Sequence, residues 1–235
     1  MIRIGLQWFL TKTGDAATPH LEAGAFIRGG PGVEHPDIQF HFLPSVVNNH
    51  GLEPGSCHAY QVHVGPMRAQ ARGYLKLRSK NPTEYPVIQP NYLDNEQDKS
   101  EMRQSIRLAR EVFAQKAFDE FRGEEITPGK DVVSDEALDA FITAKADSAY
   151  HPSCTCKMGT ENDPMAVVDN HLKVFGVQNL RVVDASVMPS IASGNLNAPT
   201  IMIAEKAADI ILGKSPLARA DKVPVYKPAT LETQR

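Results

Sequence analysis

The chain has 235 residues, of which 42% are hydrophobic and 23% are charged, and its net charge at pH 7 is −3. This ordinary globular mixture gives no indication of a nucleic-acid partner or of a broad cationic membrane face. The cysteines, Cys57, Cys154 and Cys156, are too few for a disulfide framework and fit a reducing compartment. No apolar run approaches the roughly 20 residues that cross a bilayer, and the opening segment lacks a targeting pattern.

Residues 1–60 are rich in Gly, Pro and His and show few helix signals. Apolar and polar side chains alternate over 37–43, 60–64 and 73–78. A period of two is typical of half-buried strands. These segments predict an antiparallel sheet with one covered face.

Two segments with a helical period follow. Between residues 97 and 116 an apolar stripe lies opposite Glu and Arg residues, and a Ser134 cap precedes a second apolar stripe. Both stripes are interpreted as core-facing surfaces. Their residues are Met102, Ile106, Ala109 and Phe113 in the first helix and Leu138, Phe141 and Ile142 in the second.

The last third of the chain begins with a short apolar run. Residues 180–183 predict a buried strand. A helix is expected over 198–212, with Asn197 at the cap and Gly213 just after the end. Because this helix is apolar almost all round, we expect it to be deeply buried. Residues 214–235 predict an extended surface tail.

His151 opens a segment of proline and small polar residues that suits neither helix nor strand. Such a loop can present an imidazole for acid–base work, since the unperturbed pKa of histidine, ~6.5, lies near working pH. A structural histidine satisfied by backbone groups is an alternative. A metal site with Cys154 and Cys156 is another, but the spacing is not a usual zinc pattern and no fourth ligand is evident. The residues alone favour no metal site.

Two later segments could contact a cofactor. Asp184 follows the predicted strand and could bind a ribose or ribityl hydroxyl, although an aspartate that starts a turn fits equally. The turn 193–197 leads into the predicted helix, whose amino terminus favours an anion such as a reduced flavin. An ordinary helix cap is the alternative there.

The segments 151–159, 179–189 and 194–206 together resemble the carboxyl-terminal signature of the glucose–methanol–choline (GMC) oxidoreductases. Residues 65–68 and 75–79 add to this similarity, which extends over essentially the whole chain. Within the family, the sequence is most similar to the choline-oxidising branch, and its ending, 223–235, is similar to the mitochondrial type.

The resemblance implies a role for each matching residue. His151 matches the active-site histidine that receives or stabilises the proton of the substrate hydroxyl, and Asn197 matches the second active-site position. Asp184 and Ala185 match positions that touch the FAD chain. The positions that match the flavin-facing loop and helix start are Asn195, Pro199 and Thr200.

By the same resemblance, the function is FAD-dependent oxidation of a primary alcohol, with choline giving betaine aldehyde. The electron acceptor would be a compound such as a quinone, and the enzyme would associate with the inner mitochondrial membrane, or be cytoplasmic or membrane-associated if bacterial. The alternatives are a related dehydrogenase or oxidase with another alcohol, and a non-catalytic remnant that binds a ligand or partner.

The chain departs from the family in one respect, because the Gly-x-Gly-x-x-Gly turn that holds the ADP part of FAD is absent. We therefore expect a carboxyl-terminal portion that binds little FAD by itself. A choline cation would need aromatic faces and a carboxylate. Glu22 is the candidate carboxylate, and the candidate rings are Phe26, Phe40, Phe42 and Tyr150.

The expected fold class is α+β, a mostly antiparallel sheet backed by helices. Residues 1–165 would form the substrate-binding domain, and 166–213 would complete the FAD domain. Residues 214–235 would form the tail.

Overall fold

The computed structural model describes residues 2–18, 21, 23–48, 53–54 and 57–233. The chain forms two compact units. The first comprises Met1–Pro66, Glu101–Ile142 and Pro228–Arg235, and the second comprises Met67–Ser100 and Thr143–Lys227. Antiparallel sheets and helices make up the structure, which confirms the α+β class.

The first unit is built on a three-stranded antiparallel sheet in the order β1-β2-β5. Its strands are β1 (Ala23–Ile27), β2 (Ile38–Leu43) and β5 (Gln61–Pro66). Phe40 of the central strand lies opposite Ala25 on one side and Val64 on the other. The strands predicted from the alternation over 37–43 and 60–64 are therefore confirmed. A separate pair, β3 (Val47–Asn48) with β4 (Glu53–Pro54), lies outside this sheet.

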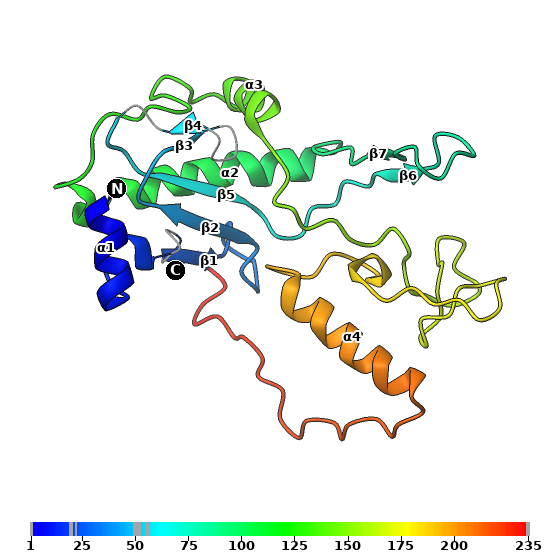
Figure 1. Cartoon of the computed structure of the whole chain (residues 1–235). Helices are drawn as coiled ribbons and strands as arrows, with labels where there is room; N and C mark the ends of the chain where they lie inside the picture. Colours follow the sequence, from blue (N-terminus) through cyan, green and yellow to red (C-terminus); the bar gives the residue numbers. More distant parts are fainter. Residues whose placement is uncertain (1, 19–20, 22, 49–52, 55–56, 234–235) are drawn as a thin grey trace. The chain divides into compact units, whose positions relative to one another are not determined.

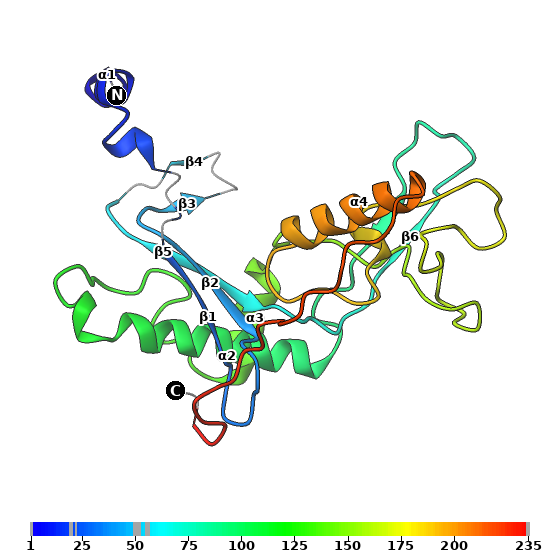
Figure 2. The same cartoon turned by 90° about the horizontal axis from the view of Figure 1, so that it is seen from below.

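Helix α2 (Glu96–Phe113) covers one face of the three-stranded sheet (Figure 1, Figure 2). Ile38 and Phe40 of β2 and Leu108 of α2 form a buried cluster, and residues of β1 and β5 pack around it. The rings of Phe42, Tyr60, Phe113 and Phe118 extend this packing, with neighbouring centroids between 5.1 and 6.4 Å apart. The helical stripe predicted over 97–116 thus faces the core.

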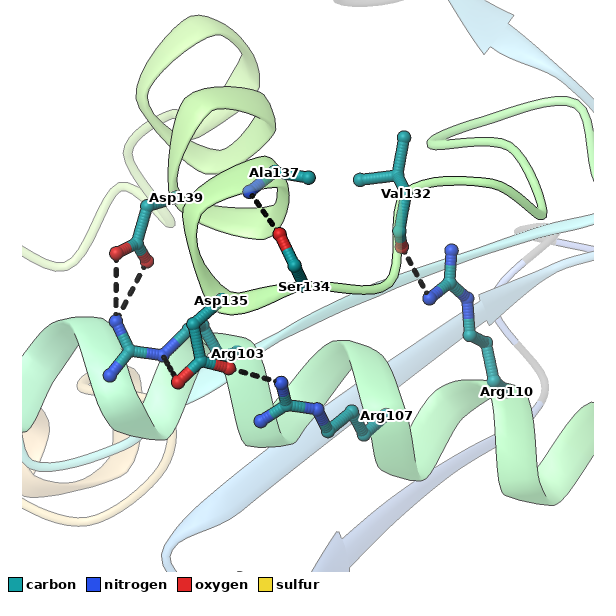
Figure 3. A network of polar contacts seen from close by, with 8 residues as sticks. All are labelled: Arg103, Arg107, Arg110, Val132, Ser134, Asp135, Ala137 and Asp139. Atoms are coloured by element: carbon teal, nitrogen blue, oxygen red, sulfur yellow. Dashed lines mark hydrogen bonds and ion pairs between the residues drawn. The ribbon is translucent and has the colours of Figure 1, made fainter.

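Charged side chains join α2 to α3 (Asp135–Lys145), as Figure 3 shows. Nη1 of Arg103 donates to both carboxylate oxygens of Asp139, at 2.9 and 2.8 Å. Arg107 pairs with Asp135, and this hydrogen bond holds the pKa of the Asp135 carboxyl below its usual value. The Ser134 hydroxyl accepts from the N–H of Ala137 at 3.2 Å, which confirms the predicted cap.

The second unit contains a two-stranded sheet, β6 (Tyr74–Lys76) with β7 (Val87–Gln89), and helix α4 (Asn197–Ile211). Its core consists of Val168, Leu172, Val187 and Ala207, against which Met158 and Ile203 pack. Between residues 154 and 184 the chain is irregular and is held by backbone hydrogen bonds and isolated bridges.

Several expectations about the elements were wrong. Helix α1 (Ile2–Thr11) occupies a region with few helix signals, and none of its residues is buried. The strand near 73–78 does not extend the three-stranded sheet. It pairs with β7 in a separate two-stranded sheet, since alternation predicts a strand but not its partner. The run 180–183 forms an isolated bridge at Arg181 and not a strand, since only that residue pairs with the 173 segment.

Helix α4 also differs from the prediction. Its cap residue is Leu196, whose side chain makes no capping hydrogen bond, and Asn197 is the first helical residue. Ala207 is its buried residue, whereas Ile201, Met202 and Ile211 are more than half exposed. The helix is therefore not deeply buried within this chain, because packing partners within the second unit cover only its Ile203–Ala207 side.

The end of the chain has neither helix nor strand within 214–233. Its last part packs in the first unit. Arg28, 6% exposed, donates from Nη1 to the carbonyl of Thr230 at 2.7 Å and from Nη2 to that of Thr233 at 3.0 Å. The N–H of Gly32 donates to the carbonyl of Leu231 at 2.6 Å.

Candidate active site

The loop that carries His151 has an unusual backbone. Tyr150, directly before it, has φ +57°, and Cys154, three residues later, has φ +72°. The left-handed region costs a non-glycine residue roughly 1–2 kcal/mol, so the surrounding contacts must hold this conformation in place. Backbone strain of this kind is concentrated at functional sites.

Three backbone hydrogen bonds attach the loop to the short 3₁₀ helix η4 (Ala185–Val187). The N–H groups of Cys154, Cys156 and Met158 donate in turn to the carbonyls of the three η4 residues, at 3.3, 2.9 and 2.9 Å. Val187 belongs to the buried core of the unit. The His151 segment is thus fixed to a rigid part of the structure, as a positioned catalytic side chain requires.

The two ring nitrogens of His151 have different surroundings. Nδ1 is buried and has no hydrogen-bond partner within the described residues. Nε2 lies 3.0 Å from Nδ2 of Asn195. Since a buried nitrogen without a partner cannot exchange protons with a ligand or with water, Nε2 is the atom through which His151 can act.

The amide beside His151 belongs to Asn195 and not to Asn197, the residue that the sequence placed in that role. Asn195 follows Gly194, whose φ of +76° turns the chain just before α4, while Asn197 is exposed in the first position of the helix. The sequence had assigned Asn195 to the cofactor. The side chain that contacts the imidazole of His151 is therefore the amide of Asn195.

A residue that the sequence did not single out also contacts this turn. Nε of Arg68 donates to Oγ of Ser193 at 2.6 Å. The only sequence signal for Arg68 was its place in the motif 65–68, and Ser193 was noted only as part of the turn.

The predicted cofactor contacts at Asp184 and Ala185 lie at η4. Asp184 is exposed, and its Oδ1 accepts from the N–H of Ser186 at 2.8 Å and from the hydroxyl of the same residue. Asp184 thus starts a turn, which is the alternative that the sequence left open, and its Oδ1 makes the hydrogen bonds of that turn. The carbonyl of Ala185 accepts from Cys154 and Met188.

The remaining predicted contacts, Pro199 and Thr200, lie in the first turn of α4. The hydroxyl of Thr200 donates to the carbonyl of Leu196 at 2.7 Å, within the helix. Since Leu196 supplies no side-chain cap and Pro199 has no N–H, the N–H groups of Asn197 and Ala198 mark the open end of the helix. Such an end favours a negatively charged group, because the helix dipole and the first N–H groups of a helix both attract an anion.

The cysteines and Glu22 are the other candidate site residues. Cys154 and Cys156 are partly buried free thiols, and within the described residues no three His, Cys, Asp or Glu side chains gather as metal ligands would. Glu22 lies outside the described residues.

Each aromatic candidate for the choline cation has its own environment. Phe40 is buried in the sheet core and Phe42 packs against other rings, so both have structural roles in the first unit. Phe26 in that unit and Tyr150 in the other are 55% and 71% exposed.

Among the described residues there is no helix long and apolar enough to span a membrane.

The chain is similar to known proteins in both sequence and structure. A family model described as GMC oxidoreductase matches residues 69–204. The chain is 65% identical over 232 residues to mitochondrial choline dehydrogenase from Mus musculus, covering 99% of this chain and 39% of that protein. It is 52% identical over 226 residues to oxygen-dependent choline dehydrogenase from Brucella ovis, covering 96% of this chain and 41% of that protein.

Among solved structures, pyridoxine 4-oxidase from Mesorbium loti superposes with a TM-score of 0.75 at 27% identity. The match covers 84% of this chain and 39% of that one. The chain thus spans about two fifths of the length of the relatives that it matches.

Proposed function

The chain belongs to the GMC oxidoreductases, and we propose that it supplies the proton-handling side chains of an enzyme that oxidises choline to betaine aldehyde. The observation that carries the proposal is the His151–Asn195 pair, with Nε2 and Nδ2 3.0 Å apart at the start of α4. The 65% identity to a mitochondrial choline dehydrogenase supports choline as the substrate.

His151 acts as the base in this proposal. Oxidation at a carbinol carbon requires the hydroxyl proton to leave or be shared, so a base must lie within hydrogen-bond reach of that oxygen. Nε2 is suited to this task, because Nδ1 is buried and has no hydrogen-bond partner in the part of the chain that the structure describes. The bonds from the loop to η4 hold the backbone that follows His151, so that the loop needs little reorganisation when the substrate binds.

Asn195 acts on the same oxygen. Its amide nitrogen can donate to an oxygen placed beside Nε2 of His151, and negative charge that develops on that oxygen then meets a fixed donor. The two side chains thus divide the work, since the imidazole takes the proton and the amide stabilises the resulting alkoxide. A substrate oxygen would take the place of the direct contact between the two side chains.

The family implies FAD, which when bound supplies the acceptor for the hydride. The open amino terminus of α4 fits its anionic edge, and we assign Asn197, Pro199 and Thr200 to that contact. Asp184 and Ala185 would contact the extended part of the cofactor, with Oδ2 of Asp184 as the acceptor, since Oδ1 accepts from Ser186. Asn197 would then serve the cofactor and not the substrate.

The finer assignments are proposals that follow from the same relatives. We propose residues 1–165 as the substrate-binding part, with Glu22 as a candidate for the choline cation, and 166–213 as the return segment of the FAD domain. We also propose a quinone-type acceptor and a mitochondrial location. The name of the mouse relative supports the location, whereas the Brucella ovis relative is named oxygen-dependent. Rates with a soluble quinone and with oxygen would separate the two acceptors.

The substrate is tested in an enzyme that carries this segment together with a complete FAD-binding domain. Choline should reduce the bound flavin with a higher kcat/KM than pyridoxine or simple primary alcohols. A preference for one of those alcohols would instead identify a related enzyme of the same fold, such as the pyridoxine 4-oxidase that superposes on this chain. No flavin binding and no reduction by any alcohol would favour the non-catalytic remnant.

A further inference from the structure

The turn that presents Asn195 has a second tether besides His151. Oγ of Ser193, two residues earlier, accepts a hydrogen bond from Nε of Arg68 at 2.6 Å, although the two residues are 125 positions apart. The turn therefore has a side-chain contact at each end, and Gly194 with its φ of +76° lies between them.

The adjoining helix anchors the end of the turn through the buried side chain of Leu196, an apolar contact that gives the Asn195 amide no direction. The cap residue Leu196 makes no side-chain hydrogen bond, and Ser193 and Asn195 are both exposed. Glycine at Gly194 also widens the range of backbone conformations open to the turn. An amide that stabilises a developing charge must be held within about 0.5 Å of its productive position.

Hydrogen bonds also hold the backbone at and next to Arg68. Its carbonyl accepts from Nε2 of Gln70 at 2.9 Å, and its neighbour Met67 is buried. The N–H groups of Gln70 and Ala71 donate to the two carboxylate oxygens of Asp98, at 2.8 and 2.9 Å. Asp98 is 2% exposed, so these bonds are shielded from water.

Asp98 is fixed in turn by Asn95. Nδ2 of Asn95 donates to the Asp98 carboxylate at 2.8 Å, and the N–H of Asp98 donates back to Oδ1 of Asn95 at 2.9 Å. The buried Asp98 carboxylate therefore holds the backbone next to Arg68, and the guanidinium of Arg68 holds the turn that carries Asn195.

We infer that Arg68 is a positioning residue, which acts through Ser193 to hold the Asn195 amide at Nε2 of His151. The inference rests on the proposed function, because it explains how the amide stays aligned with the base. The side-chain hydrogen bond of Arg68 among the described residues goes to Ser193 and not to the base or the amide. Its effect on the reaction is transmitted by the turn.

The first test measures geometry and not turnover. Ring-nitrogen chemical shifts of His151 and side-chain amide shifts of Asn195 are recorded by NMR in the 235-residue chain, for wild type, Arg68→Gln, Ser193→Ala and Ser193→Thr. Arg78→Gln is the matched control, because Nε of Arg78 also makes one exposed hydrogen bond, to the carbonyl of Tyr85 at 3.3 Å, away from the turn.

We expect Arg68→Gln and Ser193→Ala to shift the His151 and Asn195 signals together and by similar amounts. Ser193→Thr keeps the hydroxyl and should restore the wild-type shifts. The double variant Arg68→Gln/Ser193→Ala should match the single variants, because both remove the same contact. Shifts no larger than those of Arg78→Gln in both single variants would overturn the inference, and Ser193→Ala is a small exposed change that leaves this outcome readable if Arg68→Gln does not fold.

The second test measures catalysis in the flavin-loaded enzyme. Loosening a positioned group should lower kcat between about 3-fold and 100-fold with little change in KM. If the shifts move but wild-type enzyme does not oxidise choline, the positioning holds and the proposed substrate fails. If choline is oxidised but the shifts and kcat of both single variants stay at wild-type values, the positioning fails and the proposed function stands.

Discussion

Nδ2 of Asn195 lies 3.0 Å from Nε2 of His151, although 44 positions separate the two residues in the sequence. The loop around His151 is fixed to η4 by three backbone hydrogen bonds, and Asn195 lies at the turn just before α4. Both η4, through Val187, and α4, through Ala207, pack in the same core. The contact between the two side chains therefore follows from the packing of one compact unit.

The contact of Asn195 with His151 gives different roles to Asn195 and Asn197, which are two positions apart in the sequence. In the flavin-loaded enzyme we predict that Asn195→Ala lowers kcat with choline by about 10²–10³, the usual effect of losing one donor to a developing negative charge. Asn197→Ala should lower kcat less than 10-fold but weaken flavin binding. Stopped-flow flavin reduction and fluorescence titration of the flavin measure the two effects, and the reverse order would return the active-site role to Asn197.

Gly159, which ends the His151 motif, is required by close packing. A Cβ atom added there would lie 2.8 Å from Cβ of Ala166 and 3.1 Å from a carboxylate oxygen of Asp163. We predict that Gly159→Ala lowers the free energy of unfolding by about 1–3 kcal/mol, the usual cost of overpacking.

Ala166→Gly provides the matched test of this packing, because it removes the atom with which the new methyl group collides. The double variant Gly159→Ala/Ala166→Gly should be less destabilised than the sum of the single variants. Urea denaturation gives each value. Strict additivity would show that the contact does not explain the glycine.

The same loop contains an ion pair that should make stability depend on pH. Nζ of Lys157 donates to Oδ2 of Asp163 at 2.6 Å, and the N–H of Met165 donates to Oδ1 at 2.9 Å. These bonds, chiefly the one from Lys157, hold the pKa of the Asp163 carboxyl below its ordinary value of 3.8. The stabilisation is fully present above the unfolded-state pKa and is lost as the pH falls through the lower folded-state pKa.

We therefore predict that wild type is more stable than Asp163→Asn at pH 7 and at pH 5, and that the difference shrinks below about pH 4. Urea midpoints at pH 7, 5, 3 and 2 measure it. Glu161→Gln is the control, since Glu161 is an exposed carboxylate of the same loop. A difference that stays constant down to pH 2 would contradict the role given to this ion pair.

The periodic patterns in the sequence correctly predicted the helices and strands that bury one apolar face. β2, β5 and α2 lie close to their predicted positions, because their apolar faces contact the core of the first unit. Helix α3 also lies where it was predicted, and Leu138 and Ile142 of its apolar stripe are buried. The stripe of α4 predicted the helix but not its burial, since a stripe does not say what covers it. The pairing of β6 with β7, and not with β5, is a non-local choice that alternation leaves open.

The candidate site was only partly predictable for a related reason. The family motif identified His151 and the segment around Asn195, but which amide meets the imidazole depends on where α4 begins. A helix start read from sequence is uncertain by a residue or two. With Leu196 as the cap, Asn195 lies in the turn and Asn197 on the helix. Arg68 carried no chemical signal because its partner, Ser193, is distant in the chain.

The most direct measurement of the central claim is the rate at which choline reduces the flavin in a full-length enzyme with His151→Ala, compared with wild type at equal flavin occupancy. If Nε2 of His151 receives the substrate proton, the rate should fall by about 10²–10⁴ while the flavin stays bound. A variant that reduces its flavin at close to the wild-type rate would remove His151 from this role.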